Sequence, residues 1–126
     1  MSKQRFFLCE TCGNIVGLIK DGGGATWCCG AEMTELAPNT VEASTEKHLP
    51  AVTVSGDSLS VSVGSIPHPM EEGHYIGFVY VETESGGQRK RLDVGAAPVA
   101  KFNIVDDKPV AVYAYCNLHG LWKSEL

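Results

Sequence analysis

The sequence predicts a mainly β protein in which a small metal-bound β-hairpin domain is followed by an immunoglobulin-like antiparallel β-sandwich. Four of the five cysteines lie within the first thirty residues, where they predict a metal-bound module. Leu59–Val63 alternates apolar residues with serines, which is typical of a strand with one buried face. From residue 49 onward, short β-rich segments alternate with turn residues, and this spacing is typical of a sandwich.

Two domains are expected, at residues 1–37 and 38–126. A chain of 126 residues is long enough for one modest core and a small additional module. We place the linker at Leu36–Thr40, and Val41–Lys47 is the one segment with fair helical character. A first domain of roughly 35 residues is too small to be stabilised by its core alone, so a metal and a partner subunit are expected to support it.

The first domain contains a Cys-x-x-Cys-Gly turn at Cys9–Gly13, which lets two thiolates face one metal because glycine tolerates a left-handed backbone. Asn14–Lys20 and Ala25–Cys28 are predicted to be strands on either side of the turn Asp21–Gly24, forming a hairpin. The adjacent Cys28 and Cys29 complete a set of four ligands and predict a distorted tetrahedron. From the residues alone, structural zinc and iron remain equally plausible.

The second domain is predicted to contain six strands separated by turns rich in glycine, aspartate and proline. In chain order they are Leu49–Val54, Leu59–Val63, His74–Thr83, Gln88–Val94, Val99–Val105 and Val110–Cys116. Rigid strands fix the ends of the loops between them, so residues that are distant in sequence can converge at one end of the sandwich.

All four histidines and the remaining cysteine fall at strand ends or in loops of this second domain. These residues are His48, His68, His74, Cys116 and His119. Any one of them alone is more often a surface or core residue than a ligand. Together they supply one more donor than zinc normally accepts, which favours a five-coordinate transition metal with a vacant sixth position. A blue-copper site is disfavoured, because two histidines are surplus and no methionine follows His119.

Charge and hydropathy exclude several classes of function. A net charge of −5 argues against broad nucleic-acid binding. No apolar run approaches the roughly 20 residues needed to span a bilayer. The first residues lack the pattern of a signal peptide, so a cytoplasmic location is expected, where cysteines serve as metal ligands more often than as disulfides.

Four motifs together resemble the desulfoferrodoxins, the two-domain, two-iron superoxide reductases. They are Cys9-x-x-Cys12-Gly-Asn-Ile-Val with Cys28-Cys29; Glu46-Lys47-His48-x-Pro50; His68-Pro-Met-Glu-Glu-x-His74; and Tyr115-Cys116-Asn-Leu-His119-Gly. The resemblance covers essentially the whole chain. It implies a desulforedoxin-like iron domain with four cysteine ligands, a superoxide reductase sandwich domain and a homodimer.

The same resemblance implies the metal ligands. They are Cys9, Cys12, Cys28 and Cys29 for a rubredoxin-like iron, His48, His68, His74 and His119 as equatorial ligands of a catalytic iron, and Cys116 as its axial ligand. It further implies one-electron reduction of superoxide to hydrogen peroxide at this ferrous centre of four histidines and one cysteine, which an external carrier such as rubredoxin then re-reduces. Glu46 is expected to be the sixth ligand of the oxidised iron.

Lys47 is the expected attractor of superoxide, because an anion that approaches an acidic protein requires a local positive charge. Two residues depart from the family pattern: Gly73 stands where lysine is common, and Leu121 where histidine is common. Neither departure removes a ligand. Two alternatives stay open, a non-catalytic two-iron electron-transfer protein and a structural zinc-ribbon interaction module.

Overall fold

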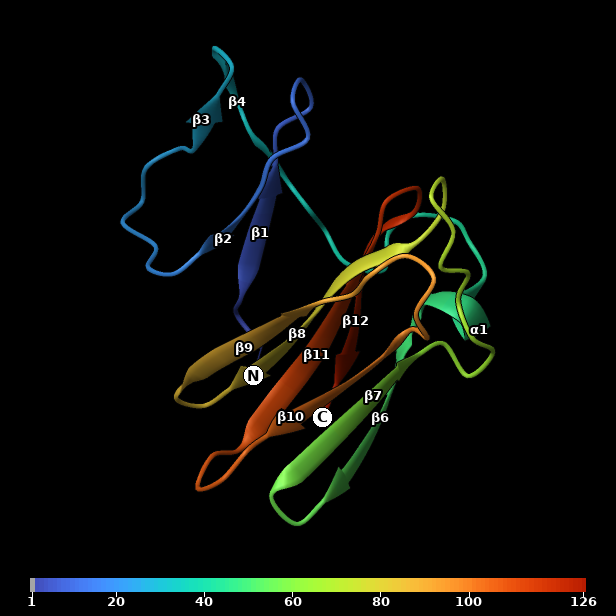
Figure 1. The fold of residues 1–126 in the computed structure, drawn as a ribbon. Helices are drawn as coiled ribbons and strands as arrows, with labels where there is room; N and C mark the ends of the chain where they lie inside the picture. Colours follow the sequence, from blue (N-terminus) through green and yellow to red (C-terminus); the bar gives the residue numbers. More distant parts are fainter. Residues whose placement is uncertain (1) are drawn as a thin grey trace. The chain divides into compact units, whose positions relative to one another are not determined.

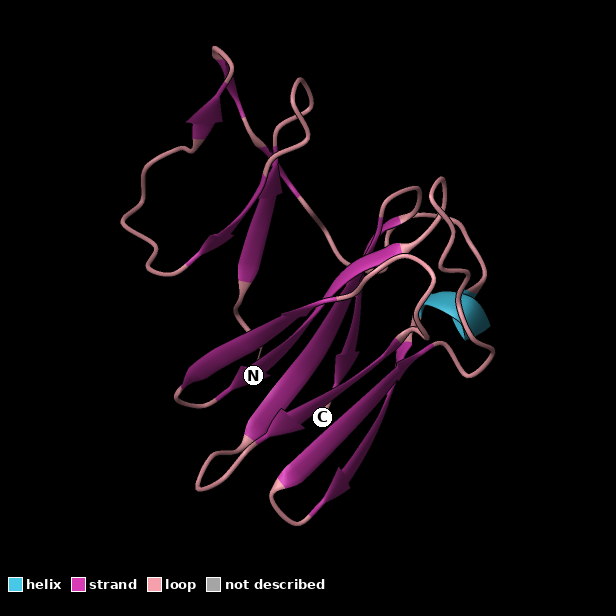
Figure 2. Cartoon of the chain, viewed as in Figure 1, coloured by secondary structure: helices cyan, strands magenta, loops and turns pink. Residues whose placement is uncertain are grey.

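A computed structural model describes residues 2–126 and divides them into two compact units (Figure 1). Lys3–Ala37 forms the small unit, and Ser2 with Pro38–Leu126 forms the large unit. Strands dominate both units (Figure 2). The predicted fold class is confirmed.

The small unit is built from five short strands. They are β1 (Arg5–Leu8), β2 (Ile15–Leu18), β3 (Trp27–Cys28), β4 (Ala31–Glu32) and β5 (Thr34–Glu35). One antiparallel sheet has the order β2-β1-β5, and β3 pairs with β4.

The hairpin predicted around Asp21–Gly24 is wrong, because β2 and β3 do not pair with each other. The Cys-x-x-Cys-Gly turn reverses the chain instead, so that β2 pairs with β1, with Phe7 opposite Val16. Gly13 has a φ of +82°, the left-handed conformation expected of it. The hairpin therefore forms around the cysteines and not around the glycine-rich run.

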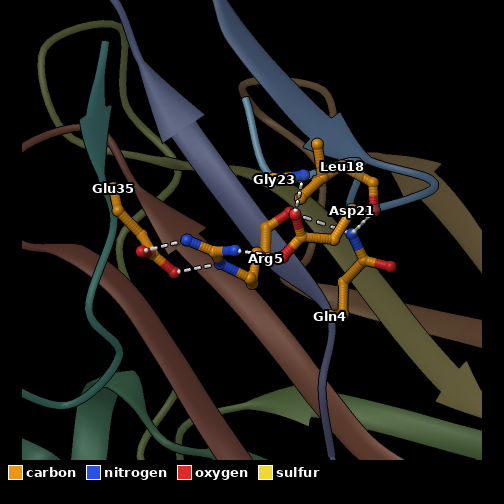
Figure 3. A network of polar contacts seen from close by, with 6 residues as sticks. All are labelled: Gln4, Arg5, Leu18, Asp21, Gly23 and Glu35. Carbon is orange, nitrogen blue, oxygen red and sulfur yellow. Dashed lines mark hydrogen bonds and ion pairs between the residues drawn. The ribbon is translucent and has the colours of Figure 1, made fainter. Parts of the chain in front are cut away.

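Few side chains stabilise the small unit. Among its hydrophobic side chains, only Phe6, Cys9 and Met33 are buried. On its surface, Arg5 pairs with Asp21 at 2.7 Å and through two nitrogens with Glu35 at 2.8 and 2.9 Å (Figure 3). Exposed ion pairs of this kind each contribute little to stability. The unit therefore depends on what its cysteines bind.

The large unit contains one short helix and seven strands. They are α1 (Thr45–His48), β6 (Pro50–Ser55), β7 (Ser58–Val63), β8 (Ile76–Thr83), β9 (Gly86–Arg91), β10 (Val99–Asn103), β11 (Pro109–Cys116) and β12 (Gly120–Glu125). They form two antiparallel sheets, β10-β7-β6 and β12-β11-β8-β9 (Figure 1). These sheets are the two layers of the sandwich.

The core of the large unit consists of the inward-facing residues of both sheets. Leu59, Val61 and Val63 of β7 are at most 1% exposed, as the alternation with serines predicts. Cys116 at the end of β11 is fully buried within the same cluster. One end of the well-packed core therefore carries a candidate metal ligand.

Two elements differ from the prediction. The helix covers Thr45–His48 only, whereas Val41–Lys47 was expected to be helical. β12 was not predicted at all. It exists because Gly120 adopts a φ of +79°, which turns the chain back along β11 and pairs Trp122 with Ala114.

Candidate metal centres

The four thiols of the small unit, those of Cys9, Cys12, Cys28 and Cys29, converge on one point and are called the four-thiol group below. Their sulfurs all lie within 4.8 Å of one another. The Cys12 and Cys28 sulfurs are 3.6 Å apart, and those of Cys28 and Cys29 are 3.9 Å apart. A tetrahedral metal with M–S bonds of about 2.3 Å would space its sulfurs by about 3.8 Å. Both spacings lie within about 0.2 Å of this value.

Electrostatics within the four-thiol group also favour a cation. The Cys12 backbone N–H lies 3.5 Å from the Cys9 sulfur and lowers the pKa of that thiol to about 6. The Cys12 sulfur, followed by the other thiols, raises the pKa of Cys29 to about 12, and Cys9 raises that of Cys28. Thiolates at this spacing oppose one another's ionisation, and a bound cation removes that opposition.

In the large unit, five candidate ligands lie at the end of the sandwich that carries α1, and they are called the five-donor group below (Figure 1). His48 ends α1, His68 lies between β7 and β8, His74 precedes β8, Cys116 ends β11, and His119 lies between β11 and β12. The donor atoms of the first four lie within 4.8 Å of one another. Nδ1 of His119 completes the group, at 3.1 Å from Nε2 of His48 and 3.7 Å from the Cys116 sulfur.

The four imidazoles form a ring. Neighbouring ring centroids are 4.6 Å apart for His48–His68 and His68–His74, 5.1 Å for His74–His119 and 4.9 Å for His48–His119. His48 and His74 lie across from each other at 6.4 Å. The nitrogens of His48 and His68 are 3.2 Å apart, close to the roughly 3 Å between neighbouring nitrogens of a square around one metal.

Hydrogen bonds of the outer ring nitrogens fix the tautomers of His48 and His68. Nδ1 of His48 lies 2.6 Å from the carbonyl oxygen of Ser44, and Nδ1 of His68 lies 2.7 Å from that of Pro69. A carbonyl only accepts, so each Nδ1 carries the hydrogen and each Nε2 presents a lone pair to the group. Among the described residues, the buried Nε2 of His74 has no hydrogen-bond partner. These donors fit a metal ion.

Burial keeps His48 and His68 neutral. It lowers the pKa of His48, and it lowers that of His68 to about 4. A neutral imidazole is the form that binds a metal. Burial also raises the pKa of Cys116, because a thiolate inside the core lacks solvation. A cation next to Cys116 would supply the missing stabilisation.

The backbone N–H groups of Leu118 and His119 act in the opposite direction and lower the pKa of the Cys116 thiol. Asn117 directly follows Cys116, but its N–H donates to the carbonyl oxygen of Tyr75 at 3.1 Å and not to the sulfur. The Asn117 side chain extends the same link, since it accepts from the Tyr75 N–H and donates to the Gly73 carbonyl. Asn117 thus positions the segment around His74 instead of tuning the thiolate.

Glu46 and Lys47 lie on α1 directly before His48, and both are exposed. The Glu46 carboxylate is not among the clustered donor atoms. Its own backbone N–H lowers the pKa of this carboxyl. The structure therefore places an anionic carboxylate and a cationic side chain beside the five-donor group without bringing either into it.

Trp122 was missed as a residue that supports the site. Its indole stacks on His48, with centroids 4.9 Å apart and an interplanar angle of 29°, and its Nε1–H donates to the His119 carbonyl at 3.1 Å. A tryptophan three residues after a candidate ligand was the available signal. Trp122 thereby orients two neighbouring ligands, as outer residues commonly do at metal sites.

Sequence comparisons cover both units. The desulfoferrodoxin domain profile matches residues 40–125, and the desulfoferrodoxin N-terminal domain profile matches residues 2–36. The chain is 43% identical to a desulfoferrodoxin of Syntrophotalea carbinolica over 98% of this chain and 97% of that protein. It is 40% identical to one of Nitratidesulfovibrio vulgaris, covering 98% of each. Among residues 2–126, no helix is both long and apolar enough to cross a bilayer.

The fold matches a solved structure over nearly its full length. The crystal structure of the superoxide reductase from Treponema pallidum superposes with a TM-score of 0.83 at 35% identity, covering 98% of this chain and all of that one. A match of this extent includes both the four-thiol unit and the sandwich. By its domain profiles and its full-length relatives, this chain belongs to the desulfoferrodoxin family.

Proposed function

We propose that this protein is a superoxide reductase, which adds one electron and two protons to superoxide to give hydrogen peroxide. The observation that carries the proposal is the group of four imidazoles and one buried thiol, next to an exposed lysine. Solved structures that share this fold, at 35% identity, are named superoxide reductases. An iron at this group would supply the single electron and take its replacement from a carrier.

His48, His68, His74, His119 and Cys116 would hold this iron. Cys116 is fully buried, whereas His74 and His119 are partly exposed. Access from solvent therefore comes from the side away from the thiolate. The Cys116 thiolate would donate electron density to a bound iron, and the N–H groups of Leu118 and His119 would limit that donation.

Lys47 attracts the substrate in this proposal. Superoxide approaches a chain with a net charge of −5, so a local cation must raise its concentration at the site. The exposed Lys47 lies next to His48 in the chain. Its position supports this role.

Glu46 serves as the reversible sixth ligand of the oxidised iron. The carboxylate is exposed, and its lowered pKa keeps it anionic near neutral pH. If Glu46 has this role, the Glu46→Ala protein will lose a pH-dependent shift of its ferric absorption band. A band that shifts with pH as in the wild type would count against ligation.

The four-thiol group of Cys9, Cys12, Cys28 and Cys29 holds the second iron and stabilises the small unit. We further propose a cytoplasmic homodimer that receives electrons from a small carrier such as rubredoxin. Exposed hydrophobic side chains on the small unit support self-association, since Ile19 is fully exposed and Trp27 is 65% exposed.

The test is to mix the reduced, iron-loaded protein anaerobically with superoxide. We expect one hydrogen peroxide per superoxide and no dioxygen. Evolution of dioxygen would instead indicate a dismutase. Absence of superoxide consumption would leave the electron-transfer alternative, and a chain loaded with zinc but no iron when isolated would indicate the zinc-ribbon alternative.

A further inference from the structure

The turn that follows β7 lies directly against α1. The backbone N–H of Ile66 donates to the Glu46 carbonyl oxygen at 2.9 Å, and the Ser65 hydroxyl donates to the same oxygen at 3.3 Å. The Gly64 N–H donates to the carbonyl oxygen of Leu49 at 3.0 Å. Three hydrogen bonds therefore join this turn to the backbone on both sides of Lys47.

Gly64 allows the two backbones to approach this closely. It has a φ of +85°, and a Cβ added to it would lie 2.7 Å from both the Glu46 carbonyl oxygen and the Lys47 Cα, and closer still to the Ile66 carbonyl oxygen. Side-chain Cβ atoms essentially never approach other atoms within 3.0 Å. Any other residue at position 64 would have to displace the Glu46–Lys47 backbone or distort the turn.

The turn also connects α1 to the rigid part of the molecule. It begins after Val63, which is fully buried in the core, and it leads to His68, whose N–H donates back to the Val63 carbonyl at 3.2 Å. The helix α1 has only four residues, a length that is not stable without outside contacts. Its position therefore depends on what the neighbouring turn provides.

We propose that Gly64, Ser65 and Ile66 form a positioning turn that holds the backbone of Glu46 and Lys47 beside the five-donor group. This inference rests on the proposed function of those two side chains. The positioning turn fixes their backbone to the sandwich. Residues 64–66 thereby set the position of the Lys47 charge, although none of them is charged.

The test compares Gly64→Ala with Gly56→Ala. Gly56 also has a positive φ, +58°, but a Cβ there meets no atom within 4 Å. Both substitutions carry the cost of a left-handed backbone, and only Gly64→Ala inserts a methyl group against α1. The measurements are hydrogen exchange by mass spectrometry and the rate with superoxide, both on the iron-loaded protein.

In Gly64→Ala we expect at least tenfold faster exchange in the peptide that covers residues 45–49. We also expect a roughly tenfold lower superoxide rate with a flatter salt dependence. The thiolate-to-metal absorption should remain, and Gly56→Ala should match the wild type. Equal behaviour of the two variants would overturn the proposal.

The Lys47→Ala variant separates this proposal from the proposed function. If Lys47→Ala slows the reaction but Gly64→Ala does not, although exchange in 45–49 has risen, the positioning turn is refuted. If exchange rises and both variants react at the wild-type rate, the substrate-attracting role of Lys47 fails and the structural link between turn and helix stands.

Should Gly64→Ala fail to fold, the wild type still gives a test. The 45–49 and 64–66 peptides should exchange at least roughly 100-fold more slowly than the unfolded chain. Ser65→Ala should speed exchange of the first peptide about twofold, and Ser65→Thr should restore it. Wild-type exchange at the unfolded rate in either peptide would overturn the proposal.

Discussion

The two candidate metal centres are built in opposite ways. The four-thiol group takes its donors from short turns of a unit with three buried hydrophobic side chains. The five-donor group takes its donors from α1, the β7–β8 connection, the β11–β12 turn and a strand end, all fixed by a well-packed sandwich. The first unit depends on its metal to fold, whereas the second holds its ligands in place before any metal binds.

Metal removal should reveal the largest difference in stability between the two units. We expect a chelator to unfold residues 3–37 while the sandwich stays folded, because only the small unit lacks a sufficient core. Hydrogen exchange of the metal-free protein would show full exchange in the small unit and retained protection in β7, β8 and β11. Simultaneous unfolding of both units would contradict the comparison.

Substitution of Cys116 should have the next largest effect. Cys116→Ser replaces a thiolate donor by a hydroxyl, and we expect at least roughly a 100-fold lower superoxide rate and loss of the thiolate-to-metal band. Stopped-flow absorbance measures both, with the absorption of the four-thiol centre as the internal control. A wild-type rate in Cys116→Ser would exclude Cys116 as a ligand of the reacting metal.

Substitution of Lys47 should have a smaller effect on the superoxide rate, confined to the approach of the substrate. Lys47→Ala should lower the bimolecular rate about tenfold at low salt and flatten its dependence on ionic strength. Lys101→Ala is the matched control, since Lys101 is also exposed but lies on β10. Identical salt dependence in the two variants would remove Lys47 from the mechanism.

Acid should destabilise the metal-free sandwich. Burial lowers the folded-state pKa of His48 and takes that of His68 to about 4, below the ordinary value of about 6.5. The folded state then binds fewer protons than the unfolded state, so this contribution is complete above pH 6.5 and is lost as pH falls towards 4.

In denaturant unfolding, the free energy of unfolding of the metal-free sandwich should therefore fall by about 2 kcal/mol between pH 6.5 and 5. His68→Gln should reduce this dependence of stability on pH, because it removes one of the two histidines. If the pH dependence of stability is unchanged in His68→Gln, other titratable groups cause the loss of stability.

The sequence predicted the sandwich because its pattern is local. Leu59, Val61 and Val63 alternate with serines, and a pleated strand converts that alternation into a buried face. β12 could not be predicted in the same way, because its buried residues Leu121 and Trp122 are adjacent and do not alternate. Pairing with β11 decides its structure.

The candidate ligands could be named from the sequence because histidine and cysteine are scarce and chemically distinctive. The groups that orient them could not. Backbone carbonyls of Ser44 and Pro69 carry no sequence signal, and the stacking of Trp122 on His48 depends on the unpredicted β12. The turn of Gly64 against α1 is likewise visible only in three dimensions.

The two centres have different proposed roles: the five-donor group reduces superoxide, and the four-thiol group stabilises the small unit. Cys29→Ser tests this difference most directly. This variant disrupts the four-thiol group and leaves every member of the five-donor group in place. Rapid mixing of its reduced form with superoxide should give a rate within about twofold of the wild type, with hydrogen peroxide and no dioxygen as products. A rate that falls as far as that of Cys116→Ser would contradict the account, because it would place the four-thiol centre in the reaction with superoxide.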